Sequence, residues 1–223
     1  MEVYATEEQQ VEAIKKWFKQ YGNMISWIII VVAFIVSATI YWRHHQQVVR
    51  DAASDQYMVL LEGLEKNDKD TIKSKADILV KEYPSSPYAS LAGFVVAHQA
   101  IEENDVAKSE EQLKWIMQHS PQQNFQDIAR IRLMRLLISQ NKLDEAMKHY
   151  SDKKGPYQTL MAELKGDILV KQKDINGAKK AYELALSSTP EEGMHGPLLK
   201  MKMQELGIES TAFDVKADEE KSS

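Results

Sequence analysis

The run Met24–Trp42 contains no charged side chain, and this feature restricts the fold more than any other in the chain. At a rise of ~1.5 Å per helical residue the run reaches roughly 28 Å, about the hydrocarbon thickness of a bilayer. Trp27, Tyr41 and Trp42 lie near its two ends, where aromatic rings favour the headgroup layer, and Arg43 follows directly. The sequence therefore predicts a single transmembrane helix at residues 24–42.

A cleaved secretory signal is the alternative interpretation of this run. Such a signal has an apolar stretch of about 7–15 residues before a cleavage site made of small residues. Val36 and Ala38 imitate that site loosely. However, the apolar run continues beyond them to Trp42, and the residues before it include glutamates as well as lysines. These features favour an anchor that is retained.

Residues 1–23 form a leader with an apolar face at helical spacing. Thr6 followed by Gln9 fits a capping box at the start of a helix. Gly22 and Asn23 are residues that often end one. We therefore expect a short amphipathic helix that ends before the span and lies on a surface, either the headgroup layer or a membrane partner.

The basic residues that flank the span favour a cytoplasmic leader by a single charge. Three lysines precede the span and two arginines follow it: Lys15, Lys16 and Lys19, then Arg43 and Arg50. Positive charge is enriched on the cytoplasmic side of membrane helices. We therefore expect the leader inside the cytoplasm and the rest of the chain outside it.

Beyond the span, helical periods separated by short turns recur, and no strand pattern is convincing. The remaining residues, about 180, suffice for one domain with a sizeable core. We predict an all-α domain at residues 43–207, whose last helix opens at Pro197 and ends at Gly207. Residues 208–223 are acidic and have little to bury, so we expect a mobile tail.

Similar residues recur in this domain at intervals near 34 residues. The clearest copy combines small residues that let two helices approach with large ones that fill the groove between them: Gly166, Leu169, Ala178, Tyr182, Ala185 and Pro190. An upstream copy contains Leu133, Leu137, Ala146 and Tyr150, and a weaker one contains Ala97, with Ser109 in the usual place of an alanine. This pattern is typical of a tetratricopeptide repeat, so we predict a helical-repeat solenoid.

Two copies depart from the pattern. The stretch Lys153–Pro156 should break the second helix of the upstream copy early, because it contains glycine and proline. The first copy, Gln46–Pro84, retains almost no signature, as expected of a terminal repeat that caps the stack.

Solenoids of this kind bind peptide segments on a concave surface, which the first helix of each pair lines. From the repeat register we predict a partner-binding groove with these residues: Leu91, Phe94, His98, Ile101, Ile131, Arg135, Ile138, Glu163, Asp167 and Val170. Such a groove would grade from an apolar end to an acidic one. The alternative is that a neighbouring helix or the first copy covers its apolar residues.

Composition excludes several other functions. A net charge of −5 argues against nucleic-acid binding, and the absence of cysteine excludes disulfides and thiolate metal sites. No catalytic motif occurs, and the adjacent pair His44–His45 points in two directions on a helix, which suits no chelate. We therefore predict a binding protein that is not an enzyme and has no cofactor or metal site. A hydrolase or transferase with a site hidden in the sequence is the alternative.

The opening Met1–Tyr4, the segment Val11–Phe18, Gly22 and an anchor that ends in Tyr41–Trp42, followed by helical repeats, resemble the YfgM family of ancillary SecYEG translocon subunits. The resemblance implies a single-pass protein of the bacterial inner membrane with a cytoplasmic N-terminus and a periplasmic domain. It also implies association with SecYEG and with the periplasmic chaperone PpiD, and contact with translocating polypeptides. A scaffold of the envelope or of cell division that uses the same repeats is the alternative.

The anchor departs from the family in its bulk. The consecutive residues Ile28–Val32 occupy its middle, where small residues would permit close helix packing. We therefore expect partner contacts to depend on the domain and the leader more than on the span.

Overall fold

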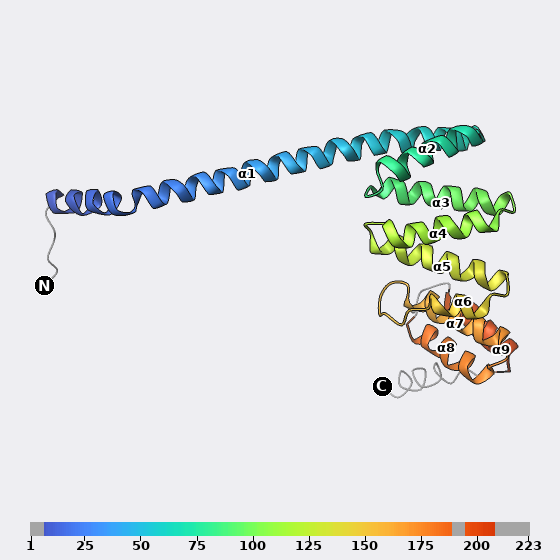
Figure 1. Ribbon diagram of the computed structural model, residues 1–223. Helices are drawn as coiled ribbons and strands as arrows, with labels where there is room; N and C mark the ends of the chain where they lie inside the picture. The colour runs from blue at the N-terminus through green and yellow to red at the C-terminus, as the bar shows by residue number, and fades with distance from the viewer. Residues whose placement is uncertain (1–6, 189–194, 208–223) are drawn as a thin grey trace, which may run out of the picture. The chain divides into compact units, whose positions relative to one another are not determined.

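The computed structural model describes residues 7–188 and 195–207, except for the side chains of residues 7–10 and 12–14. Within these described ranges the chain forms nine α-helices and no strand (Figure 1). The all-α fold class is confirmed. Pro190, the predicted capping box at Thr6 and the predicted tail at 208–223 lie outside the described residues.

The chain divides into two units, residues 1–52 and 53–223. Helix α1, Glu7–Glu65, begins in the first unit and ends in the second. The expected break at Gly22–Asn23 is therefore wrong, and the boundary predicted between residues 42 and 43 also falls inside this helix. Gly22 does not have the positive φ with which glycine ends a helix, and the Ser26 hydroxyl donates a hydrogen bond to its carbonyl oxygen at 2.9 Å. With no proline after it, the helix continues.

The uncharged run gives α1 its special character. Among the described residues α1 is the one helix long and apolar enough to cross a membrane. The protein itself buries none of its most apolar stretch, and Trp27, Tyr41 and Trp42 are all exposed. Apolar surface is unfavourable in water, at about 25 cal/mol per Å². α1 therefore contains a candidate membrane span, and the position of its three aromatic residues at the interfaces stays a prediction.

The second unit consists of helical hairpins that follow one another along the chain (Figure 1). Residues 53–65 of α1 pair with α2, and three further pairs follow, then a single helix. The bounds are α2 Lys69–Glu82, α3 Pro87–Glu102, α4 Val106–His119, α5 Gln123–Ser139, α6 Leu143–Lys148, α7 Gln158–Lys171, α8 Ile175–Ser187 and α9 His195–Glu205. Pro197 thus lies in the first turn of α9.

Every hairpin turns in the same way. The second residue before each second helix has a positive φ, between 53° and 65°: Asn67, Asn104, Asn141 and Lys173. The next residue is the N-cap, and in three hairpins it is an aspartate that accepts a hydrogen bond from a backbone N–H three residues on: Asp68, Asp105 and Asp174. The first copy, which retains almost no other signature of the repeat, therefore shares its turn with the next copy, because Asn67–Asp68 repeats Asn104–Asp105.

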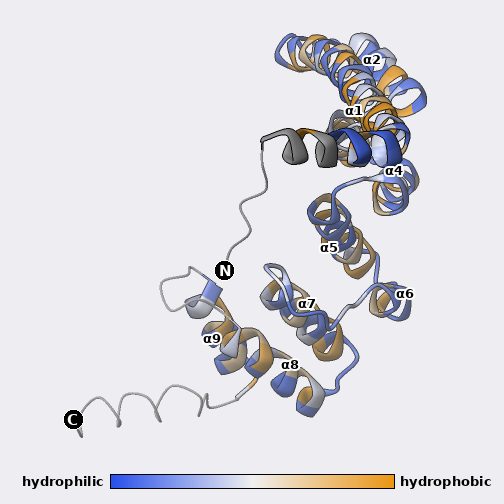
Figure 2. Cartoon of the chain, turned by 90° about the vertical axis from the view of Figure 1, so that its left-hand side faces the viewer, coloured by the Kyte–Doolittle hydropathy of each residue, from blue (hydrophilic) through white to orange (hydrophobic). Residues whose placement is uncertain are grey.

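Three buried clusters join the hairpins: one from the end of α1 to α3, one from α3 to α7 and one from α7 to α9. In Figure 2 hydrophobic residues gather mainly on the sides of the helices that face other helices. Most residues predicted to pack the repeats are buried in these clusters or in the helix contacts beside them: Ala97, Leu133, Leu137, Ala146, Gly166, Ala178, Tyr182 and Ala185. Tyr150 and Leu169 are half-buried against the same clusters.

Helix α6 is much shorter than the other second helices. It ends at Lys148, and the predicted breaker Lys153–Pro156 lies in the irregular segment that follows. Because α6 provides fewer than two turns, α7 also packs directly against α5. The predicted early end of this helix pair is confirmed, and it changes how the next helix is placed.

Helices α7 and α8 approach each other closely at Gly166. A Cβ atom added to Gly166 would lie 2.3 Å from a ring carbon of Tyr182, well inside van der Waals contact. The hydroxyl of that tyrosine donates a hydrogen bond to Asp167 at 2.7 Å, so the ring has little freedom to move away. The absence of a side chain at residue 166 therefore sets the distance between these two helices.

We predict that Gly166→Ala destabilises the domain by about 1–3 kcal/mol, because the overpacking outweighs the better helix propensity of alanine. Thermal unfolding of the full chain, followed by far-UV circular dichroism, measures the effect. Gly155→Ala is the matched control, since an added Cβ there meets no atom within 4 Å. A Gly166→Ala protein that unfolds at the same temperature as the control would contradict the close approach.

Candidate functional site: an apolar and basic groove

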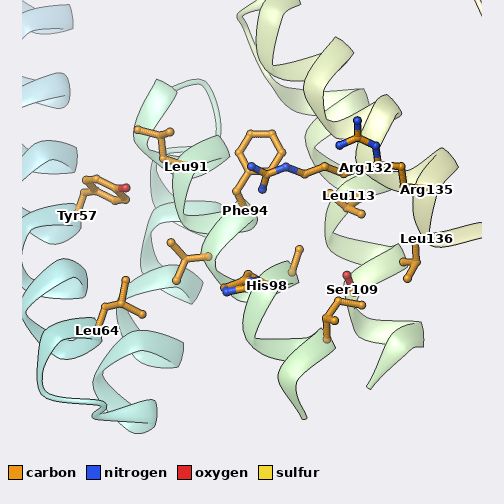
Figure 3. Close-up of a pocket in the computed structure, with 13 residues that line it drawn as sticks. Tyr57, Leu64, Leu91, Phe94, His98, Ser109, Leu113, Arg132, Arg135 and Leu136 are labelled. Carbon is orange, nitrogen blue, oxygen red and sulfur yellow. The ribbon is translucent and has the colours of Figure 1, made fainter. Parts of the chain in front are cut away.

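A cavity of about 720 Å³ opens between the end of α1 and helices α3, α4 and α5 (Figure 3). Its walls are mainly apolar and come from all four helices: Tyr57, Leu64, Leu91, Phe94, Val95, Ala97, Ile101, Leu113 and Leu136. Its polar groups are His98, Ser109, Arg132 and Arg135. A concave site of this size that is largely apolar with a few polar groups is typical of a binding site.

Phe94 is held from two sides. The ring of Phe125 meets it edge to face, with ring centres 6.1 Å apart, and the guanidinium carbon of Arg132 lies 4.6 Å from its centre. Figure 3 shows Phe94 and Arg132 pointing toward each other from α3 and α5. Stacking on a ring uses the face of a guanidinium and leaves its N–H edge able to donate hydrogen bonds.

Arg132 and Arg135 give the groove a positive charge. They are three residues apart on α5, so they lie on one side of that helix. In the part of the chain that the structure describes, neither forms an ion pair with a carboxylate, and no acidic residue lines the cavity. His98 lies 3.6 Å from Glu102, but both side chains are largely exposed. The groove therefore combines an apolar wall with two arginines whose charges the described residues leave uncompensated.

Five residues of the predicted groove meet in this cavity: Leu91, Phe94, His98, Ile101 and Arg135. The other five lie elsewhere. Ile131 is only 4% exposed and belongs to the buried cluster that α7 completes, while Ile138 and Val170 are half-buried against two cores. The direct contact of α7 with α5 places Ile131 in the interior, although it occupies the same repeat position as Phe94.

The last two predicted groove residues, Glu163 and Asp167, form an ion-paired cluster with α9. The Lys202 ammonium donates hydrogen bonds to Glu163 at 2.7 Å and to both oxygens of Asp167 at 2.8 and 2.9 Å. Burial alone would lower the pKa of Lys202, but its bonds to the two carboxylates outweigh burial and raise it. Burial and the hydrogen bond to Asp167 also raise the pKa of Tyr182 far above its ordinary value. Both carboxylates are thus ion-paired within the chain, and Lys202 balances one of their two charges.

Eight residues of the cavity lining are absent from the predicted groove, and four of them could have been found from the sequence: Tyr57, Leu64, Arg132 and Leu136. Tyr57 and Leu64 come from the first copy. An alignment of Asn67–Asp68 with Asn104–Asp105 gives them the same repeat positions as Phe94 and Ile101. Arg132 lies about one helical turn before Arg135, and Leu136 directly follows it. A groove-facing stripe of α5 with the usual width of a helix face includes both.

We predict that Lys202→Met destabilises the domain by roughly 1–3 kcal/mol at neutral pH. Breaking a buried ion pair costs about 3–5 kcal/mol, and the cost is lower here because Lys202 and Asp167 keep partial solvent access. Glu163, which is 7% exposed, is then left without its cation. Thermal unfolding of the full chain measures the loss, with the exposed Lys171→Met as control.

The difference between these two variants should shrink as the pH rises through the range in which lysine loses its proton. Because folding raises the pKa of Lys202, the stability that its ion pairs provide is fully present below the ordinary lysine pKa and is lost as the ammonium deprotonates. Equal stability of both variants at neutral pH would show that α9 is held by its apolar residues Leu199 and Met203 alone.

Comparison with known proteins gives matches along almost the whole chain. A family model described as a tetratricopeptide repeat-like domain matches residues 15–208. Proteins named ancillary SecYEG translocon subunit are similar over most of their length. The one from Escherichia coli is 25% identical over 209 residues, which are 93% of this chain and 100% of that protein.

Two further relatives carry the same name. The protein from Haemophilus influenzae is 28% identical over 90% of this chain and 97% of its own length. That from Neisseria gonorrhoeae is 24% identical over 92% of this chain and 100% of its own length. No solved structure matches the chain.

Proposed function

This chain belongs to the family of tetratricopeptide repeat-like domains, and from that premise we propose that it is a membrane-anchored accessory subunit of the bacterial Sec translocon. In this function α1 anchors the protein, and the repeat domain binds the periplasmic chaperone PpiD or translocating polypeptides. The protein performs no chemical step of its own.

The similarity to the ancillary SecYEG translocon subunits is the observation that carries the proposal. It extends over 93% of this chain and all of the Escherichia coli protein, so it includes the anchor region as well as the repeats. Repeats alone would support only a binding module, because this architecture serves many functions. The candidate span and the names of the relatives together indicate a membrane-anchored protein.

The open groove supports the binding part of the proposal. Its apolar wall comes mainly from α3 and from the end of α1, which are first helices of their pairs, and first helices line the peptide-binding surface of such solenoids. A tetratricopeptide repeat-like domain is not an enzyme family, and the accessory role of the named relatives agrees with a protein that acts by contact.

We propose that the N-terminus is cytoplasmic and that the domain after the span is periplasmic. The test uses Thr6→Cys and Ser210→Cys, since the chain has no cysteine of its own. A thiol reagent that does not cross membranes should label the variant at residue 210, but not the one at residue 6, on intact spheroplasts. Both should react after detergent is added, and labelling at residue 6 alone on intact spheroplasts would reverse the topology.

We further predict that the full chain, isolated in mild detergent, retains SecYEG and PpiD. Replacing Leu91 and Ile101 together by serine should lower the recovery of PpiD or of translocating chains about tenfold, equivalent to roughly 1.4 kcal/mol of lost contact. The control replaces Leu184 and Leu198 by serine, since both are exposed apolar residues outside the groove.

The outcomes separate the parts of this proposal. Equal recovery by both variants would remove the groove from the function. Recovery of neither SecYEG nor PpiD by the unaltered chain would contradict the translocon role, and recovery of other envelope proteins in their place would favour a scaffold.

A further inference from the structure

We propose that the groove binds a polypeptide segment in which acidic residues lie next to bulky apolar ones. The inference rests on the proposed function, in which this surface contacts other proteins, and it specifies the chemistry of the segment. The acidic side chains pair with Arg132 and Arg135, and the apolar side chain enters the cavity beside Phe94.

The two arginines provide the first half of the recognition. Arg132 is already ordered by its stacking on Phe94 at 4.6 Å, so little side-chain entropy is lost when its N–H edge binds a carboxylate. Arg135 lies on the same side of α5, and the groove that both border contains no acidic residue. A partner carboxylate would therefore meet two cations without competition from the lining of the cavity.

The apolar wall provides the second half. Leu91, Phe94 and Ile101 of α3 lie at helical spacing and face the cavity together with Tyr57. The volume of about 720 Å³ is large enough to take several side chains. Charge alone would favour any acidic surface, whereas this cavity adds a preference for a segment that also carries a bulky apolar group.

The ion-paired cluster at the other end of the concave side shows the opposite arrangement. Glu163 and Asp167 occupy the repeat positions of Ile131 and Arg135, and Lys202 of α9 forms ion pairs with both of them within the chain. Arg132 and Arg135 of α5 have no such internal counterpart among the described residues. Charge complementarity therefore favours an acidic segment from another protein.

The experiment measures peptide binding to the full chain in nanodiscs of neutral lipid. The probe is the peptide Gly-Ser-Asp-Phe-Leu-Glu-Ser-Gly with an uncharged fluorophore, and empty nanodiscs correct for partitioning. Three matched peptides replace the acids by Asn and Gln, replace both acids by Lys, or replace Phe-Leu by Ala-Ala. We expect the acidic apolar peptide to bind at least about tenfold more tightly than each of the others.

Two pairs of substitutions test the arginines. Arg132→Gln with Arg135→Gln should abolish the preference for the acidic over the neutral peptide, and Arg132→Glu with Arg135→Glu should reverse it in favour of the lysine peptide. Lys171→Glu with Lys180→Glu makes the same change in net charge at exposed residues outside the groove, and it should leave each affinity within about twofold. Native helicity of each variant is checked by circular dichroism.

Four results would overturn the inference. Equal binding of the acidic and neutral peptides would remove the charge preference, and equal binding of the Phe-Leu and Ala-Ala peptides would remove the apolar one. Peptide binding that appears only after truncation at Gly207 would make the acidic residues 208–223 of the chain itself the occupant. Self-association that Arg132→Glu with Arg135→Glu abolishes would make the occupant a second copy.

The same experiment separates this inference from the proposed function. Peptide binding to the purified chain does not require SecYEG. Selective binding without recovery of the translocon would therefore leave the groove chemistry intact and remove the translocon role. Recovery of the translocon with no peptide selectivity would keep the translocon role and remove the proposed groove chemistry.

Discussion

The tight turn inside each hairpin is the constraint on which the rest of the repeat domain depends. Asn67, Asn104 and Asn141 adopt the left-handed conformation that asparagine tolerates better than most residues, and an N-cap follows each of them. The turn thereby fixes the residue at which the second helix begins. The fourth residue after the N-cap then faces the first helix, and it is small in three hairpins: Ser109, Ala146 and Ala178. This register also sets which side of the first helix the second helix leaves uncovered. Phe94 and Tyr57 lie on that uncovered side and line the groove.

The length of α6 decides how far the groove extends. Where the second helix has its full length, as α4 does, the first helices on either side of it stay apart and leave a cavity between α3 and α5. After α6, which ends at Lys148, α7 packs directly on α5 and the surface closes over Ile131. Toward α9 the concave side is closed differently, by the ion pairs of Lys202. One irregular repeat thus confines the open apolar surface to one half of the domain.

The sequence predicts the parts of this structure that depend on local patterns. Helix pairs, the early end of α6 and the burial of Ala178 and Gly166 follow from residue type and spacing, because each reflects one helix or one close approach. The burial of Ile131 does not follow, since it depends on a contact between two first helices that only the geometry around α6 creates. The pairing of Glu163 with Lys202 joins the last repeat to a helix outside the repeat register. The continuity of α1 through Gly22 does not follow from the sequence either. A glycine that ends a helix commonly has a positive φ, and the sequence alone does not reveal the φ of Gly22.

The ion-paired cluster of Lys202 and the groove differ in whether their residues interact within the chain or remain able to bind a partner. The ion pairs of Glu163 and Asp167 with Lys202 are formed within the chain, so they contribute to the stability of the domain and leave little to gain from a partner. Arg132, Arg135 and the exposed side chain of Ile101 have no such ion pair or burial within the described residues, so in the proposed function they gain interaction energy when a partner removes water from them. A helix that tethers the domain to a membrane raises its effective concentration near any partner in that membrane. A groove of modest intrinsic affinity is then sufficient for reversible contact with such a partner.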